Sequence, residues 1–251
     1  MILVRRVVFL SLALSGSLSL SALAQPCPCP IPAGPPPIWS GSAEVSFLST
    51  SGNTSTSSFG GAVEVDYKPA PWAVIFKASY LHAETNNVAT AEQFATTLKG
   101  IRDLTPRIDV YVGGGYLRNR FSGIDALYTG DGGAGYKILT GPTHLLRVEL
   151  GFGYTHKEQA VGGNLDYAVL RSGLGYAWNF SKTASFTEDA TYSLDLSDSA
   201  NWTFLNKAAI AAALTSTFSL KASWTLLYSN EPVPTFKKTD TTTAFALVAK
   251  F

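Results

Sequence analysis

The sequence is poor in the residues that build covalent cross-links and metal centres. Among its 251 residues only two are cysteine and three are histidine. Cys27 and Cys29 have one proline between them, a spacing that disfavours a strain-free disulfide, and no other ligand stands nearby to complete a metal site. We therefore expect exposed thiols able to pair with another chain, no metal and no cofactor.

An excess of charge of one sign is also missing. The chain carries 19 basic and 18 acidic residues. Proteins that bind nucleic acids through electrostatics present clustered basic residues on one face, and the balanced composition offers no such excess. The charge balance therefore argues against a nucleic acid as the partner of this chain.

The first 24 residues have the pattern of a cleaved export signal. Arg5 and Arg6 precede an apolar run, and the A-x-A triplet at 22–24 has the small residues that signal peptidase requires. The polar stretch 15–21 disfavours the alternative of a transmembrane anchor. We predict a signal peptide over 1–24, whose removal leaves 17 basic and 18 acidic residues.

A proline-rich segment follows the signal and precedes a domain without long apolar runs. Residues 25–37 contain seven prolines in thirteen positions, a composition that forms an extended polyproline segment rather than a packed core. We predict a Pro-rich periplasmic tether there and one domain over 38–251. This domain contains no run of eighteen apolar residues, which excludes membrane-spanning helices.

The hydrophobic pattern of the domain repeats at every second residue. Leu146, Val148 and Leu150, for example, alternate with Arg147 and Glu149. On a helix these two sets would mix around the surface, whereas on a strand they lie on opposite faces. The pattern therefore predicts β-strands that have one apolar face and one polar face.

About twelve such segments follow one another, each roughly 10–15 residues long, which suits a tilted crossing of a bilayer better than a soluble strand. Short connections such as 68–71 and 140–143 alternate with longer ones such as 85–90 and 230–239, as turns and loops do in outer-membrane barrels. We predict an all-β, antiparallel, up-and-down transmembrane barrel in the outer membrane, surrounded by its lipid, with both ends in the periplasm. The segments are 38–48, 58–67, 72–84, 91–104, 109–120, 126–139, 144–157, 165–180, 184–194, 201–214, 218–229 and 240–251.

Aromatic residues stand at both ends of these segments. Trp72 and Phe180 adjoin short connections, and Trp202 and Tyr228 adjoin long ones, as in the aromatic girdles of membrane barrels. A water-soluble lipocalin-like barrel or a sandwich is the alternative, but fewer and shorter strands would be expected there. The two aromatic bands favour the membrane barrel.

The last segment ends on an aromatic residue. Leu247, Ala249 and Phe251 share one face, a pattern similar to the signal read by the outer-membrane assembly machinery. We expect that machinery and signal peptidase as partners. We also predict that this segment pairs with 38–48, because that pairing removes both open edges of the sheet.

Six motifs along the chain resemble one family. They are GNT at 52–54, LRNRFSGID at 117–125, GAGY at 133–136, ELGFGYT at 149–155, DLSD at 195–198 and KTDTTT at 238–243. Their order and spacing resemble the domain of unknown function 481 family, whose members are called salt-induced outer membrane proteins, over residues 38–251. Asn119 stands where an aspartate is expected in that family. The resemblance implies an outer-membrane barrel and supplies no activity.

Catalytic residues are scarce. His82, His144 and His156 are the three imidazole bases, and the alternation places all of them on the apolar face near strand ends. Ser172 shares that face but lies mid-strand, away from His156, so that the arrangement needed for nucleophilic catalysis is missing. We predict that the chain is not an enzyme, and an outer-membrane enzyme is the weakest of the candidate functions.

The polar face carries charges of both signs, whereas a strongly selective pore has one sign at its constriction. Barrels of eight strands are filled by side chains and those of sixteen are open, so twelve strands are intermediate. Two functions stay open: a narrow, weakly selective pore for ions or small solutes, and a non-conducting, charge-filled barrel with a structural or salt-stress role. The candidates for a central charge cluster are Arg147, Glu149, Arg171, Asp131 and Lys207.

Overall fold

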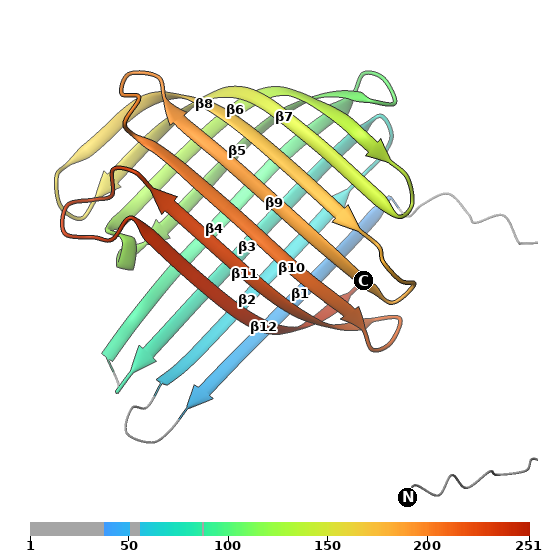
Figure 1. The fold of residues 1–251 in the computed structure, drawn as a ribbon, viewed down its shortest axis with the longest axis horizontal. Coiled ribbons are helices and arrows are strands. Elements are labelled where there is room, and N and C mark those ends of the chain that lie inside the picture. Colours follow the sequence, from blue (N-terminus) through green and yellow to red (C-terminus); the bar gives the residue numbers. More distant parts are fainter. Residues whose placement is uncertain (1–37, 51–55, 87) are drawn as a thin grey trace, which may run out of the picture. The chain divides into compact units, whose positions relative to one another are not determined.

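Twelve antiparallel strands form one closed barrel in the computed structural model, which describes residues 38–50, 56–86 and 88–251 (Figure 1). Each strand pairs with its neighbours in the chain, and β1 pairs with β12 to close the ring. The predicted all-β, up-and-down barrel is confirmed. The strands are β1 Trp39–Thr50, β2 Thr56–Tyr67, β3 Trp72–Thr85, β4 Val88–Asp103, β5 Ile108–Asn119, β6 Ile124–Thr140, β7 His144–Gln159, β8 Asn164–Trp178, β9 Ala184–Asp195, β10 Trp202–Ala213, β11 Phe218–Ser229 and β12 Thr239–Lys250.

The period of two located every strand to within a few residues. The predicted signal peptide and tether, the two cysteines and the motif at 52–54 lie outside the described residues. A short 3₁₀ helix, η1 at Arg120–Ser122, was not expected, and it precedes Gly123, whose φ is 70°. No helix in the described part of the chain is long and apolar enough to cross a bilayer.

The connections at the two ends of the barrel differ less in length than expected. The turn end carries 68–71, 104–107, 141–143, 179–183 and 214–217, and the loop end carries connections such as 196–201 and 230–238. The prediction of a long loop over 85–90 is wrong, because β3 continues to Thr85 and β4 starts at Val88. Strand pairing there continues through a register shift after Ala83 and satisfies backbone groups that a loop would leave to water. The longest connection at the loop end is 230–238.

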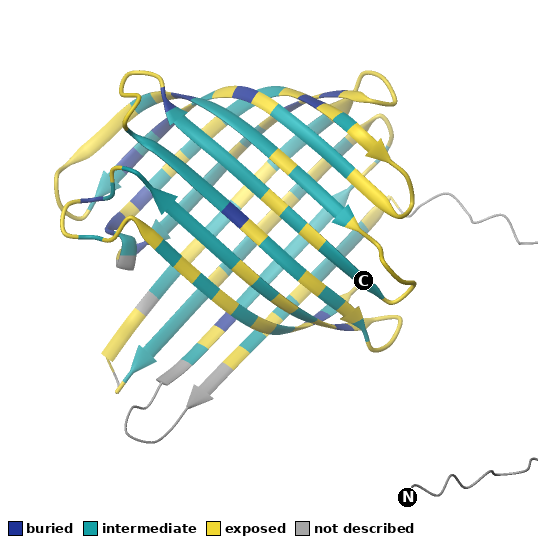
Figure 2. Ribbon diagram, viewed as in Figure 1, coloured by how far each residue is buried: buried dark blue, intermediate teal, exposed yellow. Residues whose placement is uncertain are grey.

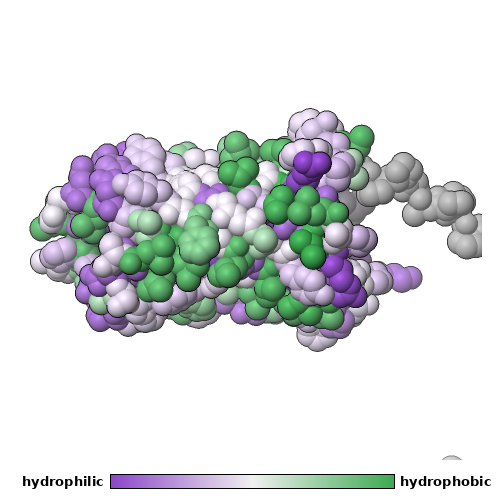
Figure 3. Space-filling model, turned by 90° about the horizontal axis from the view of Figure 1, so that it is seen from above, coloured by the Kyte–Doolittle hydropathy of each residue, from purple (hydrophilic) through white to green (hydrophobic). Residues whose placement is uncertain are grey.

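The apolar surface of the barrel faces outward. Phe47, Val112, Phe152 and Phe245 are between 64 % and 73 % exposed, and exposed residues recur along the strands (Figure 2). In the space-filling view apolar side chains gather over the middle of the visible face, and hydrophilic ones are concentrated toward its ends (Figure 3). Since apolar area is favoured only where water is excluded, this surface fits a lipid environment.

Aromatic rings form bands at both ends of the outer surface. At the loop end Trp202 lies between Tyr192 and Tyr228, with ring centroids 5.6 and 5.0 Å away. At the turn end Trp178 contacts His144 and Phe180, with centroids 5.8 and 5.4 Å away. These bands occupy the positions where aromatic girdles meet the two interfaces of a membrane.

The ring is closed by the two ends of the domain. Val45 pairs with Leu247 and Ala43 with Ala249, and the ladder is extended by Gly41 N–Phe251 O at 2.8 Å and Phe251 N–Gly41 O at 3.0 Å. The Phe251 ring lies over Gly41, where a Cβ would collide with it. A glycine at this position therefore lets the terminal aromatic ring cover the seam between the first and last strands.

A charge on the outer surface should destabilise the barrel. Val112 is 68 % exposed near the middle of β5, so Val112→Arg should lower the free energy of unfolding in lipid vesicles by about 2–4 kcal/mol. Ala209→Arg is the matched control, because its side chain lies on the inner face with Lys207 and should cost much less. Urea unfolding measures both, and equal losses would contradict the assignment of the two faces.

Candidate functional site

The inner face of the barrel holds the charged residues singled out by sequence. Arg147 and Glu149 lie on β7, Asp131 on β6, Arg171 on β8 and Lys207 on β10. The structure brings the first four together with Lys99 of β4 and Asp109 of β5. We call these six residues, with Tyr111, the packed wall.

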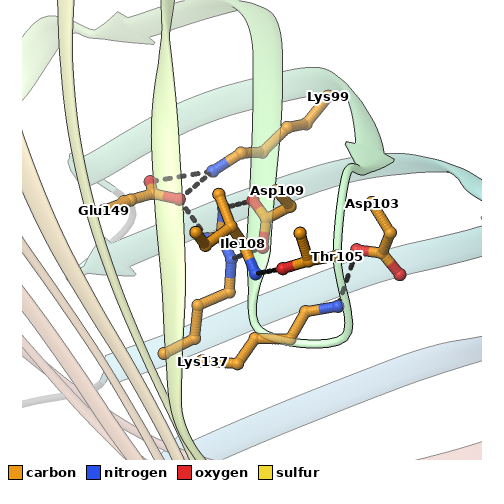
Figure 4. Close-up of polar contacts among 8 residues, drawn as sticks. Lys99, Asp103, Thr105, Ile108, Asp109, Lys137 and Glu149 are labelled. Carbon is orange, nitrogen blue, oxygen red and sulfur yellow. Dashed lines mark hydrogen bonds and ion pairs between the residues drawn. The ribbon is translucent and has the colours of Figure 1, made fainter.

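Arg147 is the centre of the packed wall. Its Nε and Nη2 donate to the two carboxylate oxygens of Asp109, at 3.0 and 2.5 Å, and its Nη1 donates to Glu149. Glu149 also accepts two bonds from Lys99 Nζ at 2.8 and 2.6 Å (Figure 4). This chain of alternating charges crosses from β4 to β7 and leaves each carboxylate with a cation.

The second ion pair of the packed wall joins Arg171 Nη1 to Asp131 at 2.7 Å. Tyr111 lies close to the first group, with Lys99 Nζ 4.1 Å from the centre of its ring. The Tyr111 hydroxyl occupies the space that a side chain at position 151 would need, since a Cβ on Gly151 would collide with it. Glycine on β7 thus makes room for a cation-π contact inside the barrel.

Burial makes the pairing in the packed wall necessary. Asp109 is completely buried, and the Asp131 and Glu149 side chains are only 9 % and 14 % exposed. A buried charge is tolerated when it is paired and hydrogen-bonded, as each of these is. The sequence reasoning missed Asp109 and Tyr111, although their alternation along β5 with Gly113 places both on the inner face.

Lys207 lies apart from the packed wall, on β10, opposite Asp189 in the strand register. It is exposed, and no ion pair to it is found in the described ranges. The sequence grouped it with Arg147 because both face inward, but alternation along a strand does not say where on the circumference the strand lies. The candidate cluster is therefore four residues with new partners, and Lys207 belongs to another part of the wall.

The part of the inner face around Lys207 is open to water. Lys77 pairs with Glu64 at 3.2 Å, yet these side chains are 51 % and 40 % exposed. Asp189 is exposed as well. Lys221 and Glu44 pair at 2.6 Å and are less exposed, at 28 % and 23 %. We call this part the hydrated wall; its members are Glu44, Glu64, Lys77, Asp189, Lys207 and Lys221. The inner face is thus most buried around Asp109 and most exposed around Lys77, Asp189 and Lys207.

The histidines take part in local contacts at the strand ends. His144 Nδ1 lies 2.9 Å from the Tyr176 hydroxyl, and His156 Nδ1 lies 2.7 Å from Asp166. Ser172 pairs with Leu150 in the register, away from His156, which pairs with Asp166. No serine–histidine contact and no cluster of metal-ligating side chains is found among the residues that the structure describes.

A closed antiparallel barrel with an apolar outer surface defines the class of transmembrane β-barrels, and solved structures of outer-membrane porins and channels are similar to the chain in fold. A NanC porin matches with a TM-score of 0.51 and 10 % identity, covering 84 % of this chain and 98 % of that one. The COG4313 outer membrane channel from Pseudomonas putida F1 matches with a TM-score of 0.52 and 10 % identity, covering 85 % and 95 %. At such identities the similarity concerns the fold alone.

The chain belongs to the family described as "Protein of unknown function, DUF481", whose profile matches residues 43–251. This confirms the resemblance derived from the six motifs. A comparison with curated proteins gives no match. The chain is therefore a member of this family with a porin-like barrel fold.

Breaking the packed wall should cost stability. Asp109→Ala leaves the Arg147 guanidinium without its fully buried partner, so we expect a loss of about 1–3 kcal/mol in the free energy of unfolding. Glu92→Ala, which removes the exposed Arg120–Glu92 pair, is the control and should cost less than about 1 kcal/mol. Urea unfolding in vesicles compares the two, and a smaller loss for Asp109→Ala would refute the role given to the pair.

Proposed function

We propose that the chain is an outer-membrane channel that conducts ions or small solutes through a narrow, water-filled passage along the hydrated wall. The observation that carries this is the exposure of charged side chains inside the barrel, 51 % for Lys77 and 40 % for Glu64. Side chains that filled the barrel completely would bury these groups, as they do Asp109 on the packed wall. A polar, solvated strip inside a lipid-facing barrel is the requirement for permeation.

The passage has weak selectivity in this proposal. The hydrated wall carries three lysines, Lys77, Lys207 and Lys221, against three carboxylates on Glu44, Glu64 and Asp189. A strongly selective pore places charge of one sign at its constriction. With both signs in equal number, small cations and anions should pass at comparable rates.

The proposed channel is exported and inserted with its turn end toward the periplasm. The signal peptide over 1–24 directs the chain across the inner membrane, signal peptidase removes it, and the assembly machinery inserts the barrel through the strand that ends on Phe251. The turn end then faces the periplasm with the Pro-rich tether of residues 25–37, and the loop end faces outward. The apolar outer surface supports lipid as the surrounding medium.

A second candidate function is a non-conducting barrel with a structural or salt-stress role. The observation that favours it is the packed wall, in which six charged residues form paired contacts and narrow the interior from one side. If the passage along the hydrated wall is too narrow for a hydrated ion, this second function applies.

Planar-bilayer recording separates the two functions. Refolded protein should produce discrete conductance steps, because water reaches the hydrated wall from within the barrel. Protein kept unfolded in urea and diluted into the same bilayer is the control. Bilayers that stay silent across a range of salt concentrations, with protein that shows heat-modifiable gel migration, would contradict the channel.

Reversing one charge of the hydrated wall should change ion preference. Lys207→Glu turns a balanced strip into one with a negative excess, so the reversal potential in a salt gradient should shift toward cation preference. Lys207→Arg keeps the charge and should leave the reversal potential unchanged. Arg147→Ala, on the packed wall, should widen the passage and raise the conductance. If all three variants conducted like the parent protein, neither wall would line the passage.

A further inference from the structure

A cavity of about 110 Å³ lies inside the barrel at its loop end, between the packed wall and the connection 230–238. This connection folds inward, since Val233 is only 2 % exposed. Val233 lies over Gly123, where a Cβ would come within 2.9 Å of it. One water molecule requires roughly 10–15 Å³ of such volume, so the cavity has room for a small organic molecule.

Lys157 is the most unusual residue of this cavity. It lies on the inner face of β7, opposite Leu127 and Leu165 in the register, and is only 8 % exposed. No carboxylate and no hydrogen-bond acceptor contacts its ammonium group within the described ranges. An ammonium group partly withdrawn from water without a counter-charge is costly, whereas Lys99, Arg147 and Arg171 of the packed wall each have a carboxylate partner. This points to an anionic ligand.

Among the other charged residues that line the cavity, cations outnumber acidic residues. Lys237 and Lys238, both exposed, contribute two more cations, and Lys238 Nζ donates a hydrogen bond to Asn230 at 3.4 Å. Arg171 contributes its buried Nε, which has no hydrogen-bond partner among the described residues. Asp240 is the one acidic residue among the lining residues, and it accepts a hydrogen bond from the Ser122 hydroxyl. Cations therefore outnumber acidic residues around this space.

The remaining lining of the cavity includes apolar side chains. Leu127, Val169 and Val233 belong to it, and Val169 is only 1 % exposed. Inorganic anions gain nothing from such surface, whereas an organic acid would bury its carbon skeleton there and place its carboxylate on Lys157. We propose that the cavity is a binding site for a small organic carboxylate with an apolar body, held by Lys157 and assisted by Arg171.

Benzoate is a suitable probe of this site, and benzamide is its neutral counterpart of the same shape. Isothermal titration of refolded protein in detergent at low salt should show benzoate binding, and benzamide binding at least about tenfold more weakly, because only the carboxylate pairs with the ammonium group. Equal binding of both compounds, or no benzoate binding, would overturn the proposal.

Substitutions of Lys157 test whether benzoate binds in the cavity. Lys157→Met should weaken benzoate binding by about tenfold or more, Lys157→Arg should retain most of it, and Lys207→Met, outside the cavity, should leave it unchanged. Unaltered binding to Lys157→Met would overturn the proposal. If that variant does not fold, the comparison of benzoate with benzamide on the parent protein decides.

The binding site does not depend on permeation. A barrel that conducts but does not bind benzoate would refute the site and leave the channel standing. A barrel that binds benzoate but is silent in bilayers would refute the channel and leave the site standing.

Discussion

Closure of the strand ring is the constraint on which the rest of this structure depends. Lipid offers no hydrogen bonds to exposed backbone groups, so a sheet can cross a membrane only when its first and last strands pair. Here β1 and β12 make that pairing, and Gly41 and Phe251 extend it to the end of the chain. Because the ring uses every strand in sequence order, alternation along each strand sorts its side chains between lipid and interior.

The closed ring concentrates charge in a small interior, and glycines decide where that charge can pack. Gly151 leaves space for Tyr111, and Gly135 faces the contact between Arg147 and Asp109, where a Cβ would collide with both. β10 has no glycine on its inner face, and its Lys207 is exposed. The glycines at 135 and 151 are therefore what allows the packed wall its close contacts around Arg147 and Tyr111.

Periodicity and turn residues were sufficient to predict the strands, their order and the faces of their side chains, because each of these is a local property. Contacts across the interior are not local. Lys207 and Arg147 have the same inward orientation, yet only Arg147 has Asp109 within reach, since distance around the ring depends on the barrel's tilt and stagger. The prediction of a loop over 85–90 was wrong because polar residues occur both in loops and at the ends of long strands that extend beyond the lipid.

Arg147 and Lys157, two inward-facing cations of β7, differ in how their charge is compensated. Arg147 is 24 % exposed and pairs with two carboxylates, so its charge is satisfied by the fold. Lys157 is 8 % exposed, lies between Leu127 and Leu165 in the strand register, and has no ion pair with a carboxylate in the described structure. A fold selected for stability alone would do better with an apolar residue at that position, because desolvating the ammonium group opposes folding. The retained charge is therefore better explained by something that enters the barrel from the loop end.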